Sequence, residues 1–289
     1  MNAEFHVHLS EAIDLDATLL SGQAFTWKRH NSSYEGLLAG IPATISPVPN
    51  NPGELLVKTV SHEGVSPQAV ANYFDDGTNY SELRNELRSL DPFCDRAIEY
   101  SPGLRLLRQD PWETLVCFIL SSCNNVPRIT GIVHRLTQLS SRHFPSPEDI
   151  VRAGESKLRQ AGAGFRAPYL IEAAKMVLDG TVDLAGLRSL PTDEAVKVLM
   201  TLPGVGRKVA SCVALYGLHK CDAFPIDVWI KKVLQQAYFG GREVELPKLE
   251  QFARKHFGSK AGYAQNWLYN WARRSRLADI SSATRSRME

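Results

Sequence analysis

Short apolar and β-branched runs, separated by polar turns, characterise residues 5–60. The runs lie at 25–27, 34–38, 43–45 and 55–60, and the stretches 31–33, 40–42 and 49–53 separate them. Runs of this length, bounded by Gly, Pro, Asn and Ser, are typical of short strands. The pattern therefore predicts a small antiparallel sheet in this part of the chain.

Helical spacing of apolar positions takes over from Tyr80 onward. Pro67 after Ser66 suits the first turn of an earlier helix, and the prolines at 145 and 147 interrupt the chain before another helix begins at Glu148. The predicted helices after Tyr80 include 112–122, 128–139, 167–178, 192–200, 228–238, 248–257 and 264–274.

These patterns predict an α+β protein with two regions. Residues 1–90 would form an antiparallel β-sheet domain, and residues 91–289 a mainly α-helical region of two subdomains with a basic C-terminal tail. The 289 residues suffice for two or three compact units, and 44% hydrophobic with 22% charged residues is typical of a globular protein. The basic residues at the end are Arg273, Arg274, Arg276, Arg285 and Arg287.

A glycine-containing hairpin at 202–207 joins two of these helices. The stretch 202–208 reads LPGVGRK, and apolar residues recur at helical spacing after it. Gly204 and Gly206 permit positive φ and carry no Cβ, so backbone N–H groups can point outward at a helix start. Such a turn suits a DNA phosphate, although a plain αα-hairpin is the alternative.

Lys208 and Asp227 are the candidate catalytic pair. Lys208 falls in the first turn of the helix after the hairpin, where the positive end of the helix disfavours an ammonium and favours a nucleophilic amine. Asp227 precedes the helix at 228–238 and is a natural N-cap. A carboxylate there can also stabilise positive charge on a sugar or assist proton transfer. The ordinary alternatives are a solvated lysine and a purely structural cap.

Charge and cysteine content reduce the number of possible functions. Net charge is only +2, but residues 201–289 hold 15 Lys and Arg against 7 Asp and Glu, which places the basic excess in the half that carries the hairpin. The chain has five cysteines and no CxxC motif, so neither a disulfide framework nor structural zinc is expected. Neither a signal peptide nor an apolar run long enough for a membrane span is evident.

Six ordered motifs resemble those of the 8-oxoguanine DNA glycosylases, within the helix-hairpin-helix (HhH-GPD) superfamily. They are 21–27 (SGQAFTW), 106–111 (LLRQDP), 121–131 (SSCNNVPRITG), 164–169 (GFRAPY), 202–208 (LPGVGRK) and 225–227 (PID). The resemblance runs from about residue 10 to about residue 275. It implies a cleft between the helical parts that holds a damaged base, and duplex DNA containing 8-oxoguanine as the partner.

The resemblance assigns a base pocket to four residues. The carbonyl of Gly22 would accept a hydrogen bond from N7–H, which guanine lacks. Gln265 would contact the Watson–Crick face, Tyr269 would stack on the base, and Cys212 would lie against it on the same helix face as Lys208. The ordinary alternatives are a turn glycine, a half-buried aromatic and a core cysteine.

A second set of residues would hold the DNA and the base left unpaired. The resemblance assigns this role to Cys123, Asn124, Asn125, Arg128, Phe165 and Arg166, with Gly204 and Gly206 at the phosphate. Two positions depart from the family pattern: Cys123 stands where asparagine is frequent, and Trp229 where histidine is frequent. Preference for cytosine opposite the lesion is therefore either relaxed or carried by the two arginines.

The chemistry implied is base excision through a Schiff base on Lys208, followed by β-elimination. No metal enters it, and the resemblance allows a monovalent cation at the hairpin carbonyls. Some relatives carry an iron–sulfur cluster on C-terminal cysteines, which is not expected here because no cysteine follows Cys221. A monomer without obligate protein partner is expected, in the bacterial cytoplasm (nucleoid) or the eukaryotic nucleus. An alkylated-purine glycosylase and a non-catalytic DNA-binding module remain as alternatives.

Overall fold

An antiparallel sheet of five strands opens the chain. The computed structural model describes residues 3–61, 64–141 and 143–274, so Arg276, Arg285 and Arg287 of the basic tail lie outside the described residues. The order β1-β5-β4-β3-β2 is built from β1 (Ala3–His8), β2 (Lys28–His30), β3 (Ser33–Leu38), β4 (Ile41–Val48) and β5 (Asn51–Thr59). The predicted sheet is confirmed.

Several of the predicted strand and turn positions are wrong. Residues 25–27 form a loop rather than a strand, and β2 begins only at Lys28. Phe25 and Trp27 are apolar because the loop buries their side chains. The indole of Trp27 donates to the Tyr73 hydroxyl at 2.8 Å. The predicted turn at 40–42 fails at Ile41 and Pro42, which lie inside β4, where Pro42 faces Leu37 of β3. The predicted turn at 49–53 fails at residues 51–53, which begin β5.

Helices make up most of the remaining chain, as predicted. The α-helices are α1 (Leu15–Leu19), α2 (Pro67–Tyr73), α3 (Tyr80–Leu90), α4 (Pro92–Tyr100), α5 (Pro111–Leu120), α6 (Val126–Thr137), α7 (Pro147–Gln160), α8 (Ala167–Leu178), α9 (Thr192–Leu199), α10 (Arg207–Cys212), α11 (Val228–Tyr238), α12 (Leu246–Phe257) and α13 (Ala261–Arg274). A π-helical turn, Val213–Gly217, continues α10. Short 3-10 turns lie at Gln138–Ser140, Gly164–Arg166, Gly186–Arg188 and Gly258–Lys260.

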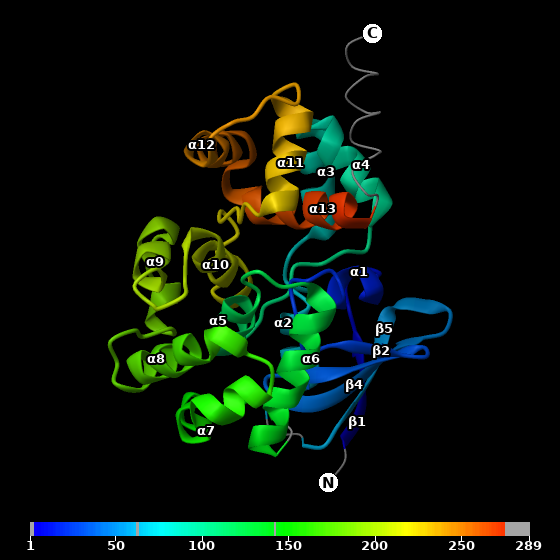
Figure 1. Cartoon of the computed structure of the whole chain (residues 1–289). Helices are drawn as coiled ribbons and strands as arrows, with labels where there is room; N and C mark the ends of the chain where they lie inside the picture. The colour runs from blue at the N-terminus through cyan, green and yellow to red at the C-terminus, as the bar shows by residue number, and fades with distance from the viewer. Residues whose placement is uncertain (1–2, 62–63, 142, 275–289) are drawn as a thin grey trace.

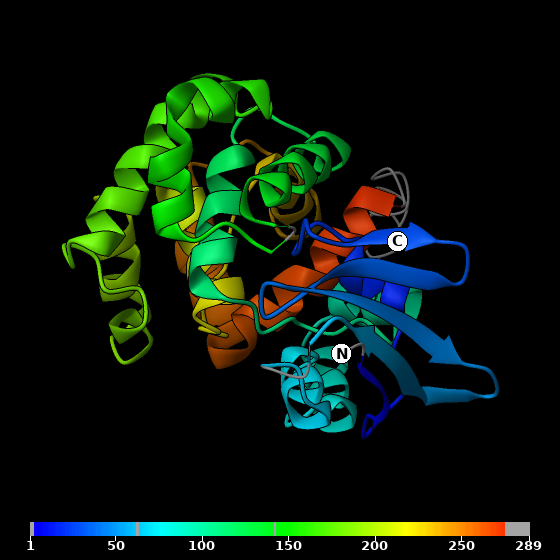
Figure 2. The same ribbon diagram turned by 90° about the horizontal axis from the view of Figure 1, so that it is seen from below.

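The helices form two groups beside the sheet. Helices α3 and α4 lie with α11, α12 and α13, whereas α5 to α10 form the second group (Figure 1). From below, the sheet stands at one side of the molecule and the helices of the second group at the other (Figure 2). In the first group, Trp267 and Asn270 of α13 donate to the carbonyl and hydroxyl of Ser101 at 3.0 and 2.7 Å. Segments far apart in the chain thus build one layer.

A buried carboxylate ties this layer to the second group. Asp75 is fully buried, and four side chains surround its oxygens: Tyr80, Tyr263, Arg108 and His219. Burial alone raises the pKa of Asp75, but hydrogen bonds from His219 and Arg108 outweigh it and hold that pKa below its usual value. Burial lowers the pKa of His219, yet its contacts with Asp75 and Cys221 prevail and raise it to about 9.

Candidate active site

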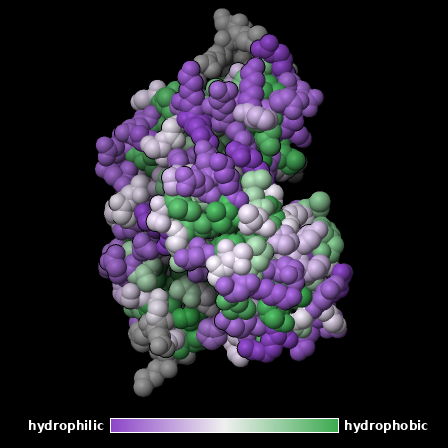
Figure 3. All heavy atoms as spheres, turned by 90° about the vertical axis from the view of Figure 1, so that its left-hand side faces the viewer, coloured by the Kyte–Doolittle hydropathy of each residue, from purple (hydrophilic) through white to green (hydrophobic). Residues whose placement is uncertain are grey.

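A cavity of about 850 Å³ lies where the two helix groups meet. Seen from one side, the surface is notched between the upper and lower parts of the molecule, and hydrophobic atoms gather there (Figure 3). Ten of the predicted site residues line the cavity: Gly22, Cys123, Asn124, Asn125, Lys208, Cys212, Asp227, Trp229, Gln265 and Tyr269. Segments far apart in the sequence therefore converge on one space, as a base pocket requires.

The hairpin leads from α9 into α10, and its two glycines differ. Gly204 has φ of +77°, and a Cβ there would lie 2.5 Å from the ring of Tyr169. Gly206 has φ of −84° and precedes α10 with no side-chain cap, so the expected positive φ applies to Gly204 alone. Nothing lies within 4 Å of a Cβ at Gly206. Both glycines are exposed, which leaves the start of α10 open to an anion.

Lys208 occupies the first turn of α10 and is half-buried. Its Nζ lies 3.3 Å from the hydroxyl oxygen of Ser121 and 5.0 Å from the centre of the Phe118 ring. The amine thus lies at the cavity wall between a polar oxygen and an aromatic face. This is not the position of a solvated surface lysine.

Asp227 caps α11 and lines the same cavity. Its Oδ1 accepts the backbone N–H groups of Trp229 at 3.0 Å and Ile230 at 2.8 Å. Its Oδ2 makes no hydrogen bond within the described ranges. One oxygen therefore holds the carboxylate in place, and the other remains available to a reacting group.

The pKa values of Cys212 and Tyr269 reflect burial in the cavity and the charges of Lys208 and Asp227. Burial raises the pKa of the Cys212 thiol to about 11, with nearby Lys208 opposing and Asp227 adding to the shift. Burial raises the pKa of Tyr269 to about 12, and the Asp227 carboxylate adds to it. Cys212 is therefore a neutral thiol at pH 7 within reach of both Lys208 and Asp227, and Tyr269 keeps its proton.

Gln265 is buried at the inner wall of the cavity. Its Oε1 accepts from the Tyr216 hydroxyl at 3.1 Å and its Nε2 donates to the Pro225 carbonyl at 3.2 Å. These contacts fix the amide plane. One N–H and one oxygen lone pair of the amide remain for a ligand.

The segment 121–125 forms the rim and is held by Arg166. The Arg166 guanidinium donates to the carbonyls of Ser122, Cys123 and Ala163, and its side chain is only 4% exposed. Cys123 itself is exposed, with φ of +49°. Arg166 thus supports the rim, a structural use that the sequence did not indicate.

Arg128 and Phe165 are two exposed members of the predicted DNA-contacting set. The Arg128 guanidinium is exposed and makes no hydrogen bond to the described part of the chain. Phe165 is 52% exposed and stands edge-on to Tyr169, with the Arg166 guanidinium 4.2 Å from its ring centre. Asn125 caps α6 by accepting from the Arg128 backbone N–H, and Asn124 donates to the Leu120 carbonyl.

Among the cavity-lining residues that had not been predicted as part of the site, Ser121, Phe118 and Arg273 lie next to predicted ones. Ser121 contacts the Lys208 amine, Phe118 lies beneath it, and Arg273 donates to the Ser21 carbonyl at 2.6 Å, next to Gly22. Ser121 begins the motif at 121–131, and that position could have identified it as a site residue. Arg273 follows Tyr269 by one helical turn, and that spacing was its signal.

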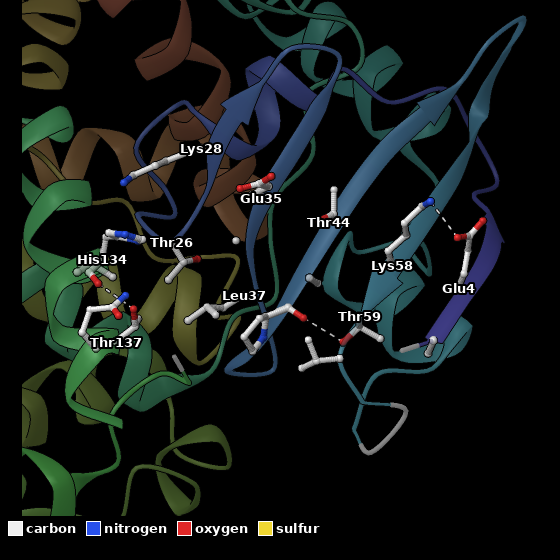
Figure 4. A pocket seen from close by; sticks show the side chains of 17 residues that line it. Glu4, Thr26, Lys28, Glu35, Leu37, Thr44, Lys58, Thr59, His134 and Thr137 are labelled. Carbon is white, nitrogen blue, oxygen red and sulfur yellow. Dashed lines mark hydrogen bonds and ion pairs between the residues drawn. The ribbon is translucent and has the colours of Figure 1, made fainter. Parts of the chain in front are cut away.

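A second cavity, of about 930 Å³, lies between the sheet and α6 (Figure 4). Its titratable side chains are all exposed: Glu4, Lys28, Glu35, Lys58 and His134. Lys58 pairs with Glu4 at 2.9 Å. A surface groove of this kind brings no buried nucleophile and acid together, so the cavity around Lys208 is the candidate active site.

Metal ligands and membrane-spanning helices are both missing from the described ranges. Among residues 3–61, 64–141 and 143–274, no three His, Cys, Asp or Glu side chains cluster as metal ligands would. Within those ranges, too, every helix falls short of the length and apolar character that crossing a bilayer requires.

Comparison with known proteins agrees with this geometry. A family model described as "8-oxoguanine DNA glycosylase, N-terminal domain" matches residues 6–115, and one described as "HhH-GPD superfamily base excision DNA repair protein" matches residues 116–257. A "Probable N-glycosylase/DNA lyase" of Methanothermobacter thermautotrophicus is 30% identical over 92% of this chain and 95% of its own. An N-glycosylase/DNA lyase of Arabidopsis thaliana is 32% identical over 89% of this chain and 76% of its own.

A solved structure extends the likeness to three dimensions. The Clostridium acetobutylicum 8-oxoguanine glycosylase/lyase, in complex with dsDNA containing cytosine opposite to 8-oxoG, superposes with a TM-score of 0.85 at 28% identity. The match covers 96% of this chain and 98% of that chain.

Proposed function

Because the chain belongs to the 8-oxoguanine DNA glycosylase family of the HhH-GPD superfamily, we propose that it excises 8-oxoguanine from duplex DNA and then nicks the strand. It is thus a bifunctional N-glycosylase/DNA lyase of base excision repair. The observation that carries this function is the shared cavity of Lys208 and Asp227, at the starts of α10 and α11.

The reaction begins with extrusion of the damaged nucleotide. A glycosidic bond inside a duplex cannot be reached, so the base rotates out at a cost of a few kcal/mol in stacking and pairing. Phe165, which is exposed next to Tyr169, is suited to enter the stack that the extruded base leaves. Arg128 offers a free guanidinium to the base left without its partner. Cys123, at the rim, accepts hydrogen bonds poorly and contributes less than an asparagine would.

The phosphate backbone is held by the hairpin. Gly204 and Gly206 remove side chains from the approach to α10, and its first N–H groups face an anion without a competing cap. Trp229 also lines the cavity and would offer a single indole N–H to the strand.

Base recognition depends on a buried polar contact. We assign the carbonyl of Gly22 as the acceptor for N7–H of 8-oxoguanine. Guanine carries a lone pair at N7, so its binding would leave the two acceptors facing each other, a large penalty in a dry site. Tyr269 stacks on the base, Gln265 meets its Watson–Crick edge, and Cys212 packs against it.

The chemical steps use the amine and the carboxylate. The neutral Lys208 amine attacks C1′, and the glycosidic bond breaks with its electron pair going to the base, which takes up the proton that the amine gives up. Asp227 stabilises the positive charge that develops on the sugar. Ring opening at O4′ gives a protonated Schiff base, which acidifies the 2′ position. Loss of a 2′ proton then expels the 3′ phosphate by β-elimination.

Three duplexes and borohydride test this function. The duplexes carry 8-oxoguanine, an alkylated purine or no lesion. A covalent adduct with the 8-oxoguanine duplex alone, lost in Lys208→Gln, is the expected result. Release of the alkylated base without an adduct would instead indicate an alkylated-purine glycosylase. Binding of all three without chemistry would indicate a DNA-binding module, and either outcome would contradict the proposal.

We further propose a domain boundary at residue 90, a monovalent cation at the hairpin carbonyls, a monomeric state and a location in the bacterial nucleoid or the eukaryotic nucleus.

A further inference from the structure

Ser121 ends α5 at the edge of the cavity, and its hydroxyl group has two neighbours. Its Oγ donates to the carbonyl of Phe118 at 2.7 Å, and it lies 3.3 Å from Nζ of Lys208. A hydroxyl has one proton and two lone pairs. Because the proton is used on the Phe118 carbonyl, Ser121 meets the amine only as an acceptor.

Phe118 restricts the amine from a second direction. The centre of its ring lies 5.0 Å from Nζ, and the ring is buried and stacked on Tyr216 at 5.7 Å. Tyr216 in turn donates to Gln265. The ring therefore cannot move aside easily, and the amine has an aromatic face on one side and an acceptor on another.

We propose that Ser121 is a positioning residue for the nucleophile, an inference that rests on the proposed function. By accepting an N–H of the neutral amine, the Ser121 oxygen restricts rotation of the lysine end group. The nitrogen lone pair is then left for the cavity, where C1′ of the extruded nucleotide would lie. Fixing a nucleophile in this way lowers the entropic part of the barrier to attack.

A serine whose hydroxyl has only a structural role provides the comparison. Ser189 ends the turn Gly186–Arg188 and donates to the Gly186 carbonyl at 2.8 Å, three residues back, as Ser121 does to Phe118. Ser189 is exposed and does not line the cavity. Ser189→Ala is therefore a matched control, because it removes the same kind of cap and no contact with the amine.

The experiment measures attack by the amine separately from recognition of the base. A duplex with a natural abasic site is incubated with enzyme and borohydride, and the single-turnover rate of adduct formation is recorded. Affinity is measured on a duplex with a tetrahydrofuran abasic analogue, which cannot form the adduct. Ser121→Ala should slow adduct formation about tenfold and change Kd less than about twofold.

Two further variants separate positioning from folding. Ser121→Cys keeps a donor for the Phe118 carbonyl but is a poor acceptor, so it should slow the adduct about as much as alanine does. Ser121→Thr keeps both properties and should remain within about threefold of the wild-type rate. Ser189→Ala should form the adduct at the wild-type rate.

Two results would overturn the inference: wild-type adduct rates in both Ser121→Ala and Ser121→Cys, or a loss of affinity in proportion to the loss of rate. If the unmodified enzyme itself forms no adduct, the proposed function fails instead. The two failures are therefore distinguishable.

Discussion

Gly22 and Tyr269 come from opposite ends of the chain, yet a Cβ on Gly22 would lie 3.6 Å from the Tyr269 hydroxyl and 3.1 Å from Val126. The backbone at Gly22 also has φ of +99°, a region that other residues rarely adopt. Position 22 therefore admits only glycine without a shift of the loop against the pocket.

Gly22→Ala should reduce 8-oxoguanine excision at least tenfold, because the added methyl group displaces the proposed carbonyl acceptor. A Cβ added at Gly77 would meet nothing within 4 Å, so Gly77→Ala is the control. Single-turnover excision rates of the two variants check the prediction. Equal rates would remove Gly22 from base recognition.

Asp227→Asn should retain lesion binding and lose turnover by about a hundredfold or more, since an amide still caps α11 but does not stabilise positive charge on the sugar. Asp110 also caps a helix, accepting from the Glu113 N–H at 2.9 Å, and it is exposed. Asp110→Asn is therefore the matched control and should keep full turnover. Full activity in Asp227→Asn would exclude that carboxylate from the mechanism.

Arg128 and Arg166 should respond differently to truncation. Arg128→Ala should weaken the preference for cytosine opposite the lesion and leave Tm unchanged, because its guanidinium makes no hydrogen bond with the described chain. Arg166→Ala should lower Tm by several degrees, because three carbonyls lose their donor. Excision opposite each of the four bases, together with thermal melting, checks both. Identical behaviour of the two variants would contradict this division.

The Asp75–His219 contact should make stability depend on pH. The pKa of His219 rises from 6.5 to about 9 on folding, so the stabilisation is complete below pH 6.5 and is lost as pH rises through 9. The loss should reach up to about 3 kcal/mol, given 1.36 kcal/mol for each pKa unit. His219→Gln should flatten the decline, whereas His30→Gln at an exposed position should not. Urea unfolding across this range measures it, and parallel curves for all three proteins would contradict it.

The sequence predicted the helices well where a local signal marks the first turn. The bounds of α8 and α11 match the predicted 167–178 and 228–238, since Pro168 and Asp227 mark helix starts. Residues 25–27 were mistaken for a strand because burial in a loop and burial in a sheet give the same apolar run. The change from α-helix to π-helix after Cys212 leaves no trace in apolar spacing.

The site was predictable as a set of motifs but not as a set of contacts. Lys208 and Asp227 were named from their motifs and Gln265 from the family resemblance, and the structure brings the three to one cavity. The Ser121 acceptor and the Arg166 contacts depend on which segments meet in space, and no local pattern specifies that. Arg166 illustrates the difficulty, since a guanidinium predicted to face DNA is occupied by backbone carbonyls.

Peptide mapping of the borohydride-trapped adduct tests the central claim most directly. The account predicts that, after trapping on an 8-oxoguanine duplex and proteolysis, mass spectrometry finds the deoxyribose remnant on Lys208. An adduct on a different lysine or on the N-terminal amine, or base release with no adduct at all, would contradict it.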